Sequence, residues 1–429
     1  MTSKLVKRVQ SLRELERAWH AIRKNARDSK SEDVQREVEN FAEDASSRIH
    51  SISWRLSRGK FKFEQAKGIP IPKVGADGQK SKTKFRPIVL APLESRIVQR
   101  SILESLMSHP AMGDYAVTPY SFGGIRRRNG QELAAVPAAV SAVLKAIEDG
   151  ARYVASADIR AFFTRISKST VRDIVSKSVQ DDEFMPLFDA AIKVELANLA
   201  DLRERAALFP IEDIGVAQGN SLSPLLGNIL LRDFDSAMNE GDCRCIRYID
   251  DFIILAPTKQ AGAARMKKAI KILADLGMEL SPEKSSKEPH SIQGSFEFLG
   301  IEFSNGFIRP STKSHQRLMT QINAALQSSL TTFRAHRVGH VFPKPQSLVS
   351  ALKRIDGIIQ GWGKHYRFCN DDTLIQYLDS LVRDCLRTYI GAYSDARERS
   401  AESERQFFLG VEKLSSIKRE PFLWPNTKS

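Results

Sequence analysis

The stretch Arg247-Tyr248-Ile249-Asp250-Asp251-Phe252-Ile253-Ile254-Leu255 places two adjacent aspartates between apolar segments. The apolar, β-branched and aromatic residues on both sides predict two strands, and the acidic pair predicts the tight turn between them. Two neighbouring carboxylates repel each other, and their burial without a partner is expensive. A divalent cation removes that cost, because hard cations prefer carboxylate oxygens. The stretch is therefore a candidate metal site at the tip of a hairpin. The ordinary alternative is a solvated turn, where Asp is common: a bare Asp-Asp pair favours that turn, and with the flanking strands both interpretations stay open.

Charge is distributed unevenly along the 429 residues. The chain has 65 Lys and Arg against 51 Asp and Glu, a formal net charge of +14. Residues 1–110 carry +10, residues 111–310 carry −3 and residues 311–429 carry +7. A basic balance favours a polyanionic partner, since Lys and Arg that neutralise phosphates release counterions. We expect basic flanks that bind nucleic acid around an acidic centre, with a merely basic surface as the alternative.

The spacing of the cysteines and the hydropathy of the chain indicate in which cellular compartment the protein is expected. The four cysteines have neither zinc-ligand nor disulfide-framework spacing, which fits a reducing cytoplasm. The N-terminus lacks the apolar segment of a signal peptide, and no apolar run approaches membrane-spanning length. We therefore expect a soluble cytoplasmic protein with no membrane partner.

Apolar spacing and turn residues predict the order of elements. We expect helices over residues 1–65, with one helix over 34–56. Two strands, 68–73 and 85–90, follow, joined by a mobile basic loop. Helices are then expected over 93–107 and 130–148, a buried strand over 151–159, mostly helix over 169–208, a loop over 215–220 and a helix over 221–238. After the hairpin come a helix over 259–276, a strand pair over 296–303 and 307–309, and a helical segment from 312 onward.

A third acidic residue, Asp158, ends the strand over 151–159, 92 positions before Asp250. Taken singly, Asp158 is more often a strand-end cap. One strand-end Asp together with an Asp-Asp hairpin is what two-metal phosphoryl transfer needs, with two ions about 4 Å apart on the attacking and leaving oxygens.

At this point the sequence resembles the reverse transcriptases of bacteria, specifically those close to the group II intron-encoded proteins. Tyr248-Ile249-Asp250-Asp251 looks like the Tyr-x-Asp-Asp box of that family, and Asp158 followed by Phe163 looks like its first palm motif. Residues 217–229 resemble the Pro-Gln-Gly box, with Ala217 in place of the usual Pro. The remaining boxes are similar in the correct order: Arg86-Pro87-Ile88, Arg96-Ile97-Val98-Gln99, Ser121-Phe122-Gly123, Leu280–Lys284, Phe298-Leu299-Gly300 and, in the intron-type thumb, Ile359–Tyr366.

The resemblance implies a role for each matching residue. Asp158, Asp250 and Asp251 would be catalytic and, with the Ile159 carbonyl, would hold two Mg²⁺ ions. The implied nucleotide-binding residues are Arg86, Lys84 (with Lys82 as a weaker candidate), Phe163, Gln218 and Gly219, and the implied primer or template residues are Tyr248, Arg126, Arg127 and Lys284. Phe163 would act as a steric gate against a ribose 2′-hydroxyl. The alternatives are a core position for Phe163 and solvated side chains for the lysines and arginines. For Trp362 and Tyr366, four residues apart, core packing is favoured over base stacking.

The implied fold class is α+β, a right-hand polymerase with fingers, an antiparallel-sheet palm and an α-helical thumb. Its expected divisions are an N-terminal helical extension over 1–66, fingers over 67–150, a palm over 151–310, and a helical thumb with a C-terminal tail over 311–429. The expected function is RNA-directed DNA polymerase, a nucleotidyltransferase. Its partners would be an RNA template, a DNA primer or product and dNTPs, with homo-oligomer formation left open.

The biological role has several alternatives. The last forty or so residues show no sign of an accessory nuclease, and a compact polymerase of this kind resembles the anti-phage defence enzymes that copy a cognate structured non-coding RNA. The alternatives are a group II intron maturase that acts as an RNA-binding splicing cofactor, and RNA-templated RNA synthesis.

Overall fold

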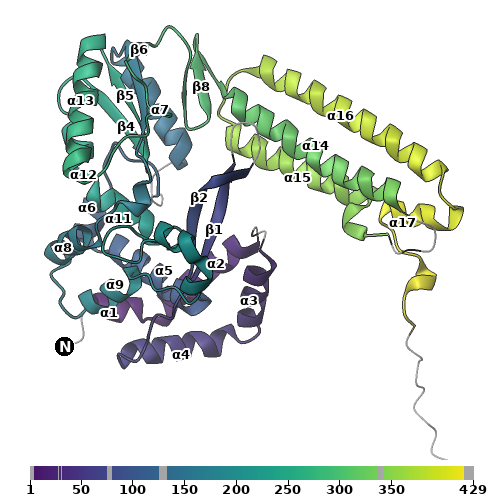
Figure 1. Ribbon diagram of the computed structural model, residues 1–429, viewed down its shortest axis with the longest axis horizontal. Coiled ribbons are helices and arrows are strands. Elements are labelled where there is room, and N and C mark those ends of the chain that lie inside the picture. Colours follow the sequence, from purple (N-terminus) through teal and green to yellow (C-terminus); the bar gives the residue numbers. More distant parts are fainter. Residues whose placement is uncertain are drawn as a thin grey trace, which may run out of the picture. The chain divides into compact units, whose positions relative to one another are not determined.

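The computed structural model describes residues 4–27, 29, 31–74, 80–124, 133–336, 340 and 342–419. These residues form two compact units, Met1–Ser291 and Ile292–Ser429 (Figure 1). No helix in the described part of the chain is both long and apolar enough to cross a membrane.

The first unit begins with helices that pack on one another. They are α1 (Lys4–Val9), α2 (Leu12–Arg27), α3 (Glu32–Ala42), α4 (Ala45–Ser57), α5 (Leu93–Met107) and α6 (Pro110–Ala116). Leu15 and Trp19 of α2 are buried in the core, and α2 packs on α5. The expected single helix over 34–56 is wrong. Asp44 leaves the helical region at φ −138° and becomes the N-cap of α4, so the chain forms two helices.

A two-stranded antiparallel sheet follows, with β1 (Lys67–Val74) paired to β2 (Lys80–Leu90) in a register that places Ile71 opposite Arg86. This confirms the expected strand pair. However, β2 begins at Lys80, so Lys82 and Lys84 belong to a strand instead of the expected loop. The Ser81 hydroxyl accepts a hydrogen bond from the Lys84 amide at 2.8 Å, which satisfies a donor where the ladder with β1 is irregular.

The central sheet is antiparallel throughout and has the strand order β4-β5-β3-β6. Its strands are β3 (Tyr153–Asp158), β4 (Arg244–Tyr248), β5 (Asp251–Ala256) and β6 (His290–Ser291). Helices α7 (Ala135–Glu148) and α13 (Lys259–Asp275) pack against it (Figure 1). Phe252 to Ala256 of β5 are fully buried, as expected for a central strand covered by helices. An antiparallel sheet with helices packed on it confirms the α+β class.

Several short helices connect β3 to β4. They are η1 (Phe162–Thr164), α8 (Lys168–Val179), α9 (Met185–Ile192), α10 (Leu199–Leu202), η2 (Arg203–Leu208), α11 (Ser223–Leu230) and α12 (Arg232–Met238). The expected helix over 221–238 is divided at Leu231, whose φ of −93° and ψ of 8° interrupt the helical hydrogen bonding.

The second unit contains a small sheet and a helical core. Its strands are β7 (Phe296–Phe298), β8 (Ile301–Ser304) and β9 (Phe307–Pro310), and its helices are α14 (Thr312–Ala335), η3 (Lys344–Gln346), α15 (Leu348–Tyr366), α16 (Asp372–Glu398), η4 (Glu402–Glu404), α17 (Arg405–Leu409) and η5 (Leu414–Ser416). The expected strand over 296–303 is instead a hairpin, because Leu299 and Gly300 have φ of +55° and +75° and reverse the chain. Trp362 is half-buried and packs against the helical core, which agrees with core packing for this residue, whereas Tyr366 is half-buried and donates a hydrogen bond to Ser314.

Candidate active site

The two aspartates of the opening stretch lie at the tip of a hairpin formed by β4 and β5, residues 244–256, called here the aspartate hairpin. Tyr248 pairs with Asp251, so Ile249 and Asp250 form a two-residue turn. Ile249 has φ of +62°, while Asp250 keeps a negative φ, the pattern of a type II′ turn that normally places Gly first. A β-branched residue in this conformation costs about 1–3 kcal/mol and persists only where its surroundings hold it.

The third predicted aspartate lies beside the tip. Asp158 is the last residue of β3 and faces Asp251 in register across β3 and β5. The Ile159 amide donates a hydrogen bond to the Asp250 carbonyl at 2.8 Å. The fold therefore brings together Asp158, Asp250 and Asp251 from two segments that are 92 residues apart.

Burial and mutual repulsion dominate the electrostatics of this cluster. Burial raises the pKa of Asp250, and the charge of Asp158 raises it further, while Lys284 and Arg86 oppose the shift. Burial, with the charges of Asp158 and Asp250, raises the pKa of Asp251 to about 7. Neighbouring buried carboxylates repel each other when they are ionised. A divalent cation bound between them would compensate that negative charge.

Two lysines that were predicted to contact nucleotide, primer or template, Lys284 and Lys84, form ion pairs within the chain. The Lys284 ammonium lies 2.7 Å from Asp158 Oδ2. Lys84 of β2 lies 3.2 Å from Glu283, with both side chains largely exposed, so this second pair contributes little to stability. Arg86, also on β2, is exposed, and its charge acts on Asp250. The segment after α13 thus carries one residue, Lys284, that contacts the acidic cluster and another, Glu283, that contacts the β1–β2 sheet.

Hydrogen bonds hold residues 279–285 against the C-terminal end of β3, on the side that does not pair with β5. The Ser281 amide donates to the Asp158 carbonyl at 2.8 Å, and the Arg160 amide donates to Glu279 at 2.8 Å. The Ser285 hydroxyl accepts from the Asp158 amide. These contacts position Lys284 above Asp158.

The donor set fits a hard cation such as Mg²⁺, because carboxylate oxygens are its preferred protein ligands. Among the described residues, however, no three His, Cys, Asp or Glu side chains already form an arrangement that holds a metal ion. In this arrangement the Lys284 ammonium contacts Asp158 Oδ2. Two-metal binding would therefore require Lys284 to leave Asp158 and the aspartate side chains to converge.

The predicted nucleotide-binding loop lies against β2. Val89 donates its amide hydrogen to the Gln218 carbonyl at 2.8 Å. Gly219 has φ of +124°, and a Cβ there would lie 2.6 Å from the Val89 carbonyl oxygen, so this glycine permits close contact with β2. The Val216 amide donates to the Phe163 carbonyl at 2.7 Å, which joins the loop to the turn after β3. Gln218 and Phe163 are both half-buried.

Of the remaining residues predicted to contact primer or template, the structure describes Tyr248 but not Arg126 and Arg127. Tyr248 and Ile249 lie against Gly123, where an added Cβ would come within 2.9 Å of Tyr248 Cδ1 and 2.6 Å of Ile249 Cγ1. The predicted residues Arg126 and Arg127 lie outside the described residues.

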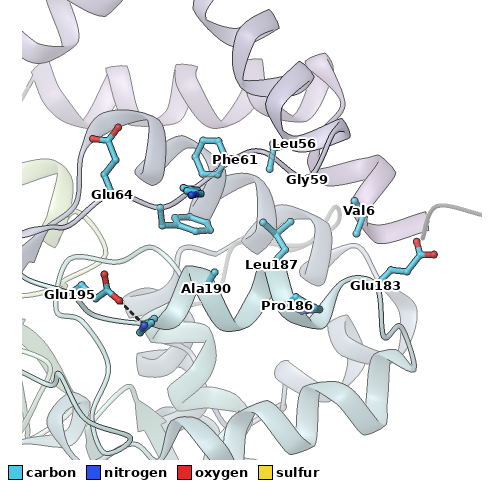
Figure 2. A pocket seen from close by; sticks show the side chains of 13 residues that line it. Val6, Leu56, Gly59, Phe61, Glu64, Glu183, Pro186, Leu187, Ala190 and Glu195 are labelled. Carbon is cyan, nitrogen blue, oxygen red and sulfur yellow. Dashed lines mark ion pairs between the residues drawn. The ribbon is translucent and has the colours of Figure 1, made fainter.

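A cavity of about 530 Å³ lies away from this cluster, between the N-terminal helices and α9 (Figure 2). Its walls include Leu56, Phe61 and Leu187, and the rim carries charged groups such as the Lys193–Glu195 ion pair. None of the predicted site residues lines it in the described part of the chain. A smaller cavity of about 390 Å³ includes Gly219 in its lining.

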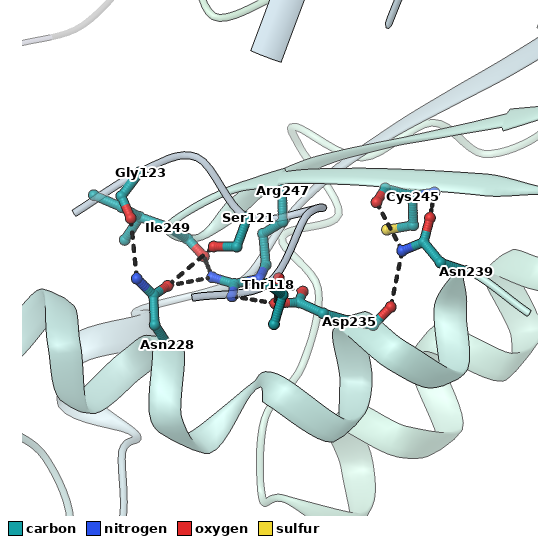
Figure 3. A network of polar contacts seen from close by, with 9 residues as sticks. All are labelled: Thr118, Ser121, Gly123, Asn228, Asp235, Asn239, Cys245, Arg247 and Ile249. Atoms are coloured by element: carbon teal, nitrogen blue, oxygen red, sulfur yellow. Dashed lines mark hydrogen bonds and ion pairs between the residues drawn. The ribbon is translucent and has the colours of Figure 1, made fainter. Parts of the chain in front are cut away.

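A buried polar network beneath the aspartate hairpin was missed by the sequence interpretation (Figure 3). Arg247 is fully buried and forms an ion pair with Asp235 of α12 at 2.6 Å. Asn228 of α11 also contacts Arg247. The signal was Arg247 two residues after the apolar Cys245, on the same face of β4, since a charge is rarely buried there without a partner.

Comparison with known proteins places the chain in a family. Its sequence matches the reverse transcriptase (RNA-dependent DNA polymerase) family over residues 71–303, more than half of the chain. The chain therefore belongs to the reverse transcriptase family, a class of nucleotidyltransferases. The matched segment contains all three clustered aspartates.

Individual relatives are more distant. The protein YkfC of Escherichia coli (strain K12) is 26% identical over 270 residues, which cover 54% of this chain and 66% of YkfC, just under two thirds of its length. Among solved structures, a partial Cas6-RT-Cas1–Cas2 complex has a TM-score of 0.35 and 18% identity, covering 64% of this chain and 43% of that chain. Apo telomerase from Candida tropicalis, truncated from its C-terminal domain, has a TM-score of 0.37 and 14% identity, covering 61% and 59%. The family assignment rests on the sequence match.

Proposed function

We propose that the chain is an RNA-directed DNA polymerase that adds dNTPs to a primer on an RNA template. The observation that carries the proposal is the register of β3 and β5, which places Asp158 opposite Asp251 beside Asp250. Carboxylates from two strands at one sheet end are suited to binding cations that meet a triphosphate. The family match supports the same activity.

The chain's own residues would divide the work. Asp158, Asp250 and Asp251, with the Ile159 carbonyl, would hold two Mg²⁺ ions. Bound there, the ions would activate the primer hydroxyl and stabilise the leaving oxygen. Arg86 would contact the triphosphate through charge-assisted hydrogen bonds, and Lys84 would join it after leaving Glu283. Phe163, half-buried beside the Gln218 loop, would exclude a 2′-hydroxyl. The proposed functional divisions are those expected from the sequence, with the palm around β3, β4 and β5.

A primer-extension assay tests this proposal. The full chain is supplied with an RNA template, a DNA primer, dNTPs and Mg²⁺, and compared with the variant Asp250→Ala/Asp251→Ala. We expect the variant to lose extension by at least about a thousandfold, since it removes two of three cation-binding carboxylates. Asp275→Asn, an exposed change at the end of α13, is the matched control and should extend like the wild type. Equal extension by the double variant would refute the assignment.

For the biological role we propose copying of a cognate structured non-coding RNA in anti-phage defence. The basic flanks, +10 over residues 1–110 and +7 over 311–429, support a large RNA partner. Sequencing the nucleic acid that co-purifies with the protein tests this. One recurrent structured RNA with its DNA copy would support it, whereas spliced or unspliced intron RNA would identify the maturase alternative.

A further inference from the structure

Arg247 is the largest fully buried side chain among the described residues, with an exposed fraction of 0%. It lies one residue before Tyr248, in β4 of the aspartate hairpin. Burial of a guanidinium is expensive unless all its donors are satisfied. A strand needs no charge at an inward position to pair with its neighbours, so the contacts of this side chain require an explanation.

The guanidinium is held from three sides (Figure 3). Its Nε and Nη2 donate to the two carboxylate oxygens of Asp235 at 2.7 and 2.6 Å. This is a bidentate contact that fixes orientation as well as distance. Its Nη1 donates to Asn228 Oδ1 at 3.0 Å and to the Ile249 carbonyl at 2.9 Å.

The contact with Ile249 links the network to the turn. Ile249 is the β-branched residue at φ +62°, and its carbonyl belongs to the peptide that leads into Asp250. A strained turn residue persists only where other contacts determine it. The Nη1 donor reaches that carbonyl from inside the protein, so the orientation of the guanidinium fixes the orientation of the peptide before the first aspartate.

A second set of contacts fixes the other side of the turn. Asn228 donates to the Gly123 carbonyl at 3.1 Å and accepts from the Ser121 hydroxyl at 3.2 Å. The Phe122 amide donates to the Arg247 carbonyl at 3.0 Å. The segment carrying Gly123 thus lies against Ile249, where any Cβ at residue 123 would collide with it.

Stability alone does not account for this arrangement. A buried ion pair replaced by well-packed apolar residues often leaves stability unchanged or raised, because the desolvation of both charges is avoided. What apolar residues do not provide is a directed donor to the Ile249 carbonyl.

We infer that Arg247, oriented by Asp235 and Asn228, is a positioning residue that holds the Ile249–Asp250 peptide and thereby sets where the two hairpin carboxylates lie. The inference rests on the proposed polymerase function. A carboxylate site tolerates about 0.5 Å of displacement, and an error near 1 Å costs on the order of a hundredfold in rate. Loss of Arg247 should therefore lower kcat and raise the Mg²⁺ concentration for half-maximal rate, with little change in the KM for primer and template.

Two variants of the full chain test the inference. Arg247→Lys keeps the charge and loses the bidentate geometry, whereas Arg247→Met/Asp235→Leu replaces the whole ion pair by apolar groups. Arg244→Met is the matched control, because Arg244 lies in the same strand and donates to the Gly241 and Cys243 carbonyls. Each protein is measured for melting temperature, for kcat and KM, and for hydrogen exchange of the hairpin amides without divalent metal.

We expect both Arg247 variants to lose about a hundredfold in kcat. Their hairpin amides, and not those of the α2–α5 pair, should exchange at least about tenfold faster, while the control stays like the wild type. The double variant should melt at or above the wild-type temperature while remaining slow.

Wild-type kcat and wild-type hairpin exchange in a folded Arg247→Lys or double variant would overturn the inference. So would faster exchange spread over the whole first unit, since that indicates general destabilisation. If the wild type itself does not extend primers, the proposed function fails, whereas the exchange measurement still decides whether Arg247 holds the turn.

Discussion

The Lys284 ammonium lies 2.7 Å from the Asp158 carboxylate, on the aspartate that faces Asp251 across β3 and β5. A cation from the chain thus contacts an oxygen that the proposed metal site needs. The Lys284 side chain is 65% exposed, so solvent weakens this ion pair and leaves it exchangeable.

Lys284→Ala should lower the Mg²⁺ concentration for half-maximal extension. An ion pair of this exposure is worth about 1 kcal/mol, so removing the competing ammonium should reduce the requirement about fivefold. Lys287→Ala, three residues further along and also exposed, is the control. A magnesium titration measures the effect, and an unchanged or increased requirement in Lys284→Ala would contradict it.

Asp251→Asn should stabilise the protein in the absence of divalent metal at pH 8. The pKa of Asp251 is raised to about 7, so ionisation is harder in the folded state than in the unfolded chain. The free energy of unfolding of the wild type therefore falls as pH rises from about 4 to about 7 and stays low above that. We expect Asp251→Asn to be more stable by about 1–3 kcal/mol at pH 8 and to lose this advantage by pH 4. Denaturant unfolding at both pH values measures it, and an equal difference at both would be inconsistent with this origin.

Truncation of Phe162 should lower the stability of the protein, whereas truncation of the neighbouring Phe163 should change its choice between rNTPs and dNTPs. Phe162 is buried against Gly227, so Phe162→Ala should cost about 3–5 kcal/mol of stability. Phe163 is half-buried, and Phe163→Ala should fold and accept rNTPs at least about tenfold better relative to dNTPs, because one added hydroxyl is discriminated by pocket shape. Competition between dATP and ATP in primer extension measures the ratio. No gain of rNTP use by Phe163→Ala would remove the gate assignment.

RNA affinity should fall steeply with salt. Each phosphate neutralised by Lys or Arg contributes a slope of roughly −0.7 to −0.9 to log K against log salt concentration. A chain with basic flanks should make several such contacts, and filter binding between 50 and 200 mM KCl (about the range where such slopes are measured) gives their number. A flat response would show that the positive charge does not contact the RNA.

Local sequence determined much of the fold and part of the site. The apolar runs around Asp250 and Asp251 are long enough to specify two strands, and the helix over Leu93–Met107 was predicted with its observed bounds. The position of Asp158 at the end of a strand and the order of the boxes indicated an acidic polymerase centre. These features depend on residue periodicity and turn chemistry, which act over a few residues.

Only the tertiary structure decided what each charged group contacts. From the sequence alone, Lys284 and Lys84 could equally be solvated lysines, because the sequence does not show that Asp158 and Glu283 lie within ion-pair distance of them. The sequence does not indicate the contacts of Arg247 for the same reason: its partners Asp235 and Asn228 come from helices 12 and 19 residues earlier, and only folding aligns them. The same folding holds Ile249 at a positive φ that its own β-branched side chain disfavours. Long-range packing, which local preference does not encode, thus sets the position of Asp250 and Asp251 at the tip of the aspartate hairpin.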